Sequence, residues 1–156
     1  MGVFFLAGLG LGATGCQSSF DKGPAQTALT SITVNDQTRS QIFTVTRQVF
    51  LAHGFTETVK KNDQLTFERP GTTADNLAYG SLLFDQKVNI RAVVTTTSVN
   101  PNQTLVGCNA WLCQAGGDAF LNDEHKVGPL RKGPYEELMK EIQMQLRYQA
   151  MSQSSP

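Results

Sequence analysis

The chain has 156 residues, with 13 basic and 13 acidic side chains, and 40% of its residues are hydrophobic. This length and composition are those of one globular domain with a single hydrophobic core. The balanced charge, with basic residues scattered along the sequence, argues against a nucleic-acid-binding protein. No apolar run of 18 residues follows the first dozen positions, which excludes a membrane protein with several spans, and three Cys are too few for a disulfide-rich miniprotein.

The first 15 residues have the composition of a secretory signal peptide. Met1–Gly15 carries no charged side chain, and its apolar run Val3–Leu11 is too short to span a membrane. The segment Ala13-Thr14-Gly15-Cys16 resembles the lipobox of bacterial lipoproteins, in which small residues precede a cysteine that is diacylated on sulfur and becomes the mature N-terminus. The match covers these four residues. It departs from the usual pattern at Ala13, where Leu is commonest, and in having no basic residue before the apolar run.

This resemblance implies a membrane anchor. Residues 1–15 would be the signal peptide, Cys16 would carry the lipid, and residues 16–28 would form a flexible tether rich in Ser, Gly and Gln. Gln17 stands where lipoproteins retained at the inner membrane have Asp. In a Gram-negative host we therefore expect an outer-membrane lipoprotein that faces the periplasm.

Residues 29–149 are expected to form one α+β domain, which begins with a short edge strand over residues 29–34. A helix follows, and Asn35 or Asp36 is expected to cap its N-terminus. Gly54 followed by Phe55 is typical of a glycine C-cap with a hydrophobic contact. The apolar positions that recur at helical spacing are Ile42, Val45, Val49 and Ala52.

Two hairpins are expected next. In the first, the strands around the polar segment 60–64 place Val59 opposite Leu65 and Glu57 opposite Phe67. The face shared by Phe55, Val59, Leu65 and Phe67 would then be apolar, and Glu57 would form a diagonal ion pair with Arg69.

The second hairpin is predicted by two twelve-residue strands, 88–99 and 103–114, joined by Asn100-Pro101-Asn102. Pairing Val99 with Gln103 makes one face apolar on both strands, whereas a slip of one residue would destroy this pattern. The opposed apolar pairs would be Ile90 with Leu112, Ala92 with Ala110, Val94 with Cys108 and Thr96 with Val106. The other face would place Arg91 opposite Trp111, close to Asn109, and these three residues are our candidate binding face.

A second amphipathic helix is expected to begin at Pro134 and to fray from Ala150, so that residues 150–156 form a loose tail. Its buried positions would be Tyr135, Leu138, Ile142 and Leu146. The predicted fold is thus two helices packed on one face of an antiparallel sheet of four or five strands, a two-layer sandwich.

Cys108 and Cys113 have two alternative interpretations. In a continuous strand they lie on opposite faces about 17 Å apart, which is too far for a disulfide. A tight turn over residues 109–112 would allow them to pair in the oxidising compartment that a signal peptide implies. Their C-x4-C spacing is too weak a pattern to assign a metal site with His53 or His125, so we expect no metal and no cofactor.

The segment that follows the sheet contains a cluster of titratable side chains: Asp118, Asp123, Glu124 and His125. A His beside carboxylates can act as an acid–base pair, although a solvated loop explains such a cluster more often. The chain has no Gly-x-Ser-x-Gly, Walker or His-Glu-x-x-His motif, and we assign no catalytic residue.

The layout as a whole resembles the small α+β lipoproteins of bacterial envelopes. Our leading hypothesis is a non-enzymatic lipoprotein, held on the membrane through Cys16, that binds another envelope component and no nucleic acid. We expect this component to be a protein, bound either by the polar sheet face around Arg91 and Trp111 or by the long loops. The alternative hypothesis is a lipid-anchored hydrolase or small-ligand carrier that uses the segment 118–125.

Overall fold

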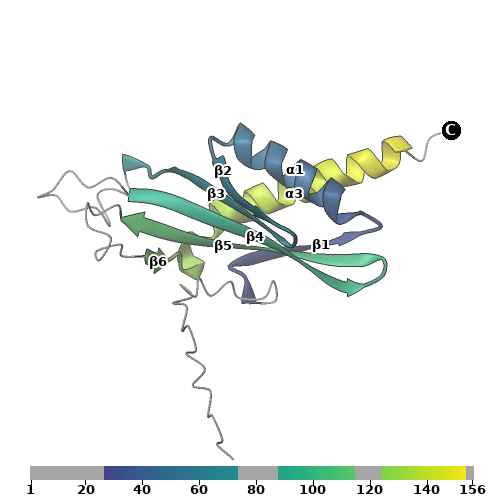
Figure 1. The fold of residues 1–156 in the computed structure, drawn as a ribbon, viewed down its shortest axis with the longest axis horizontal. Helices are drawn as coiled ribbons and strands as arrows, with labels where there is room; N and C mark the ends of the chain where they lie inside the picture. Colours follow the sequence, from purple (N-terminus) through teal and green to yellow (C-terminus); the bar gives the residue numbers. More distant parts are fainter. Residues whose placement is uncertain (1–26, 74–87, 115–123, 154–156) are drawn as a thin grey trace, which may run out of the picture.

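A computed structural model describes residues 27–73, 88–114 and 124–153 (Figure 1). Its elements in chain order are β1 (Thr30–Asn35), α1 (Arg39–Ala52), β2 (Thr56–Lys61), β3 (Gln64–Pro70), β4 (Val88–Asn100), β5 (Gln103–Gln114), β6 (Glu124–Lys126), the short 3-10 helix η2 (Pro129–Arg131) and α3 (Gly133–Gln153). The expected signal peptide and most of the tether lie outside the described residues. No described helix is both long enough and apolar enough to cross a bilayer.

The strands form one antiparallel sheet in the order β1-β5-β4-β3-β2, and β6 also pairs with β5. Figure 1 shows α1 and α3 side by side over the same face of this sheet, and both helices contribute to one hydrophobic core. The expected α+β class is therefore confirmed. Within the described ranges the sheet has six strands, where the sequence predicted four or five, because the pattern did not reveal β6.

The register predicted for the second hairpin is confirmed from Val88 to Ser98, including Val94 opposite Cys108 and Arg91 opposite Trp111. The pairing at its turn is different, since Gln103 lies opposite Asn100 and not opposite Val99. The register shifts between Ser98 and Asn100, so Val99 is left outside the paired positions and is 55% exposed.

The first hairpin has Glu57 opposite Phe67, as predicted, but Val59 lies opposite Thr66. A register shift between Glu57 and Val59 moves Val59 off the apolar face, where we had expected it, and leaves it 42% exposed.

The predicted ion pair between Glu57 and Arg69 is also wrong. Glu57 binds Arg47 of α1, and the Arg69 guanidinium lies 4.9 Å from the centre of the Phe55 ring. The partner of the Glu57 carboxylate is therefore an arginine on the neighbouring helix, which the geometry of the strands alone could not predict.

Helix α1 is capped at both ends by its own sequence. Thr38 is the N-cap, in place of the expected Asn35 or Asp36, and it forms a reciprocal capping box with Gln41. At the other end Gly54 adopts a φ of 78°, as its predicted C-cap role requires. The Phe55 N–H donates to the Phe50 carbonyl at 3.0 Å, and the buried Phe55 ring closes the end of the helix.

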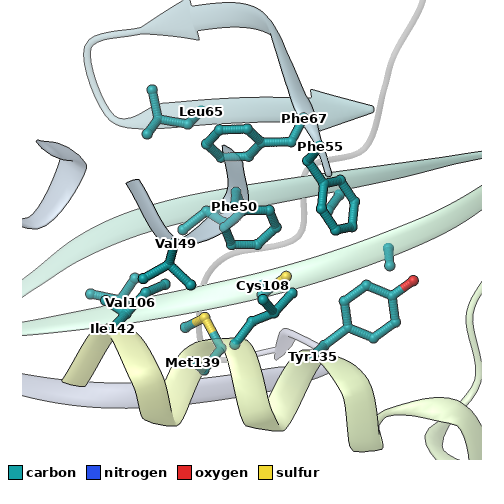
Figure 2. Packing of buried hydrophobic residues seen from close by; sticks show 14 of the residues in the cluster. Val49, Phe50, Phe55, Leu65, Phe67, Val106, Cys108, Tyr135, Met139 and Ile142 are labelled. Atoms are coloured by element: carbon teal, nitrogen blue, oxygen red, sulfur yellow. The ribbon is translucent and has the colours of Figure 1, made fainter. Parts of the chain in front are cut away.

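Helix α3 begins at Gly133, one residue before the expected Pro134, and continues to Gln153 beyond the predicted fraying point. Its predicted apolar positions are all buried, and Met139 joins them. Figure 2 shows Met139 and Ile142 beside Val106 and Cys108 of β5. The core between the helices and the sheet is therefore continuous.

An aromatic cluster joins α1 to the first hairpin (Figure 2). The Phe50 ring stacks on Phe67 at 4.4 Å between centroids and meets Phe55 edge-on at 5.1 Å. These contacts fix α1 over β3 and, with the caps, determine where the N-terminal end of α1 lies relative to the hairpin turn.

Both cysteines of β5 are free thiols. The strand continues without a break through residues 109–112, so Cys108 and Cys113 lie on opposite faces, and the turn that a disulfide would need is not formed.

Candidate functional site

The face of the sheet opposite to α1 and α3 carries a row of four residues that lie opposite one another across four strands. Glu68 of β3 pairs with Arg91 of β4, Arg91 with Trp111 of β5, and Trp111 with Lys126 of β6. Directly opposed residues of antiparallel strands project to the same face, so these side chains are neighbours. We call this set the Trp111 row. It contains two of the three residues of the predicted binding face.

Arg91 is held in place by carboxylates on both sides. Its Nε donates to Glu68 Oε1 at 2.6 Å, and its Nη1 donates to Glu124 Oε1. Burial alone would lower the pKa of Arg91, but the hydrogen bond to Glu68 and the nearby negative charges outweigh burial and raise it. The guanidinium is therefore permanently charged and fixed, and two carboxylates neutralise it.

Asn109, the third residue of the predicted binding face, is only 2% exposed. Its Oδ1 accepts a hydrogen bond from the Leu29 N–H at 3.0 Å, which attaches the chain just before β1 to β5. Asn109 projects to the same face as Trp111, two residues along β5, but it connects β5 to the chain before β1 and is not itself presented to a partner.

Cys113 lies next to the Trp111 row, with its Sγ 3.8 Å from Glu124 Oε1. Burial raises the pKa of the Cys113 thiol to about 11; the charge of Arg91 lowers it, and Glu124 raises it further. At neutral pH this cysteine is a protonated thiol and a poor nucleophile.

The candidate loop site is only partly described. Asp118 and Asp123 lie outside the described residues, whereas Glu124 and His125 belong to β6, which pairs with residues 111–113 of β5. A solvated loop is thus the wrong interpretation for Glu124–Lys126. Adjacent strand residues point to opposite faces, so Glu124, bound to Arg91, does not share a face with His125.

The described residues contain no group of three His, Cys, Asp or Glu side chains placed to hold a metal ion. Cys113 and Glu124 are neighbours, but the Glu124 carboxylate already forms an ion pair with Arg91.

Comparison with known proteins does not identify a family. No protein-family profile and no curated protein matches the chain. Among solved structures, the chain is similar to one described as the crystal structure of the adenylate sensor from AMP-activated protein kinase in complex with 5-aminoimidazole-4-carboxamide 1-beta-D-ribofuranotide. The TM-score is 0.42 and the sequence identity is 9%, and the match covers 74% of this chain and 93% of that chain. A likeness this weak carries no argument about function.

A groove of about 410 Å³ lies between α1 and the β2–β3 hairpin, and the sequence pattern did not reveal it. We call it the basic groove. Its lining residues are Arg39, Ser40, Phe43, Thr44, Arg47, Lys60, Lys61 and Asn62. The fold therefore brings together four of the 13 basic residues that look scattered in the sequence. The one available signal was the adjacent pair Lys60 and Lys61 at the predicted turn, which gives no hint that a helix contributes two arginines.

Proposed function

We propose that this protein is a lipid-anchored lipoprotein of a bacterial cell envelope, whose domain binds another envelope protein through the Trp111 row and does not catalyse a reaction. The lipobox-like segment that ends at Cys16 supports the anchor. The observation that supports the binding role is the position of Trp111, a partly exposed indole between Arg91 and Lys126 on the face of the sheet opposite to α1 and α3. In a Gram-negative host the domain would face the periplasm.

The composition of the Trp111 row suits recognition of a protein. Trp and Arg are the residues that most often dominate binding energy at protein interfaces. Arg91 is already fixed by Glu68 and Glu124, so it loses little conformational freedom when a partner binds. The two cations and two carboxylates at this site balance, which favours a partner surface of mixed polarity over a highly charged polymer.

The alternative, a hydrolase or small-ligand carrier, would use the segment 118–125. Such a site needs a free carboxylate beside His125, but Arg91 binds Glu124. No contact of the described residues favours this alternative over protein binding.

The anchor is tested by Cys16→Ser in the full chain. Each buried acyl CH₂ contributes about 0.8 kcal/mol, so two or more long chains hold a domain of this size on a bilayer without help from its surface. We expect the variant to remain unprocessed or to become soluble when the envelope is fractionated. If it were processed normally and stayed with the membranes, Cys16 would not be the anchor.

The binding role is tested by cross-linking in intact envelopes and purification of the tagged protein. Trp111→Ala should lose the captured protein. Tyr148→Ala should retain it, because Tyr148 is an aromatic residue of α3 that is 64% exposed and lies outside the Trp111 row. The proposal would be wrong if both variants captured the same proteins as the wild type, and a small molecule in the purified chain would then favour the carrier alternative.

A further inference from the structure

The basic groove brings together positive charge from two segments that are distant in the sequence. Arg39 and Arg47 lie on α1, and Lys60 and Lys61 lie at the end of β2. The Arg39 Nη1 donates to the Asn62 carbonyl at 3.3 Å, which holds the hairpin turn against the start of the helix. Four cations therefore line one concave surface, and no carboxylate is among its lining residues.

Most of this charge is not neutralised by other side chains in the part of the chain that the structure describes. Arg47 is paired with Glu57, but within the described residues Arg39, Lys60 and Lys61 have no carboxylate at ion-pair distance. Elsewhere on the domain, Arg91 and Lys132 do have such partners. Three exposed cations with no counter-charge repel one another, and an anion bound between them would relieve this repulsion.

The start of α1 adds to the positive potential of the groove. The backbone N–H groups of a helix N-terminus are equivalent to a partial positive charge, so acidic residues are favoured there. Helix α1 has no acidic residue in its first turn and begins with Arg39. A cation at this position opposes the helix dipole, which is a local cost of the kind that proteins accept at functional sites.

Protection of the sheet edge is a competing explanation for the lysines. Strand β2 is at one end of the strand order, and Lys on an edge strand discourages pairing with another molecule. This explanation does not account for Arg39, which lies on the helix and not on the edge strand.

We propose that the basic groove binds phosphate groups. Guanidinium, ammonium and hydroxyl donors converge there, and a phosphate has enough oxygen atoms to accept hydrogen bonds from several of them at once. Arg39, Lys60 and Lys61 supply the charge, and Ser40 supplies a hydroxyl group at the start of the helix. The phosphate belongs either to a free phosphorylated molecule or to the headgroup of an anionic lipid. This inference is independent of the Trp111 row, which lies on the other face of the sheet.

The test uses the full chain with Cys16→Ser, so that no lipid anchor contributes. Titration calorimetry with inorganic pyrophosphate at constant ionic strength measures the free ligand. Co-sedimentation with phosphatidylglycerol vesicles, compared with phosphatidylcholine vesicles, measures the lipid. Lys60→Gln with Lys61→Gln removes two charges from the groove, and Lys140→Gln with Arg147→Gln removes two exposed charges from α3 as the matched control.

We expect the groove variant to bind at least roughly tenfold more weakly than the wild type, and the control to bind like the wild type. Pyrophosphate binding with this dependence supports a free phosphorylated ligand, and vesicle binding alone with the same dependence supports a lipid headgroup. The proposal is overturned if the wild type binds neither probe, or if both variants weaken binding equally.

Ser40→Glu is a second variant that leaves every lysine in place. A carboxylate in the first turn favours the helix, so the variant should be at least as stable as the wild type, yet it should lose phosphate binding. Unchanged binding in this variant would also overturn the proposal.

Discussion

Replacing Cys108 by Asp tests whether the β5 register buries this residue as described. Cys108 is 0% exposed, lies opposite Val94 and faces α3 close to Met139 (Figure 2). Burial raises the pKa of its thiol from the ordinary 9.0 to about 12. Such a rise corresponds to a penalty of roughly 4 kcal/mol for a charge at this position. We therefore expect Cys108→Asp to lose about 3 to 4 kcal/mol of unfolding free energy at pH 7, a large part of the total stability of a small domain.

The stability lost in Cys108→Asp should increase with pH. Burial would raise the pKa of the new Asp carboxyl in the folded state above its unfolded value of about 3.9. The protonated form is then tolerated at low pH, and stability is lost as the pH rises from about 4 towards the folded pKa. The maximum slope is about 1.4 kcal/mol per pH unit.

Urea unfolding at pH 5 and pH 7 measures both effects, with Cys113→Ser as the control. Cys113 is half-buried on the other face and Ser brings no charge to it, so this variant should lose much less stability, and its loss should not change between the two pH values. Equal unfolding midpoints for the two variants, or a deficit of Cys108→Asp that does not change with pH, would refute the assigned register.

Three further predictions follow from local geometry. Gly54→Ala should cost about 1 kcal/mol of unfolding free energy, because φ is 78° at this position and Ala adopts a positive φ less readily than Gly. No atom lies within 4 Å of the added Cβ, so a larger loss in thermal unfolding would contradict this open environment. Thr38→Ala should cost about 1 kcal/mol by removing the capping box. Asn35→Ala leaves this box in place and should cost clearly less, and denaturant unfolding of both variants measures the difference. Iodoacetamide should label Cys113 at pH 8 about 100-fold more slowly than an ordinary thiol of pKa 9.0. Labelling should be slower still in Arg91→Gln, because the charge of Arg91 lowers the pKa of this thiol. If mass spectrometry showed the same labelling rate in folded and urea-unfolded chains, the raised pKa of about 11 would be contradicted.

The parts of the fold that could be predicted from the sequence are those with a strict pattern. The β4–β5 register followed from the alternation of apolar and polar residues, since a slip of one position would have buried Arg91 and exposed Val94. The C-cap at Gly54 was predictable because few residues other than Gly tolerate its positive φ.

The errors in the fold arose where tertiary contacts override a local pattern. Both hairpins contain a register shift, and neither Val59 nor Val99 carries a sequence signal for it. Strand β6 has three exposed residues and no alternation, so only its pairing with β5 reveals it. The Arg47–Glu57 pair depends on how α1 packs against β2, which the sequence of the strands cannot supply.

Only part of the candidate site could be predicted from the sequence. The pairing of Arg91 with Trp111 followed from the register, but the carboxylates that hold Arg91 come from β3 and β6, and the structural role of Asn109 depends on β1. The basic groove was not predictable because its cations are separated in the sequence and meet only when the hairpin turn lies against the start of α1.

Site-specific photo-cross-linking in the intact envelope tests the proposed function most directly. A photo-reactive residue at position 126, at the exposed end of the Trp111 row, is compared with one at position 148 on α3, with Cys16 intact in both chains. We predict a discrete protein adduct from position 126 that is lost when Trp111→Ala is added, and no such adduct from position 148. An adduct from position 148 alone, or an adduct from position 126 that persists in Trp111→Ala, would show that the partner binds elsewhere.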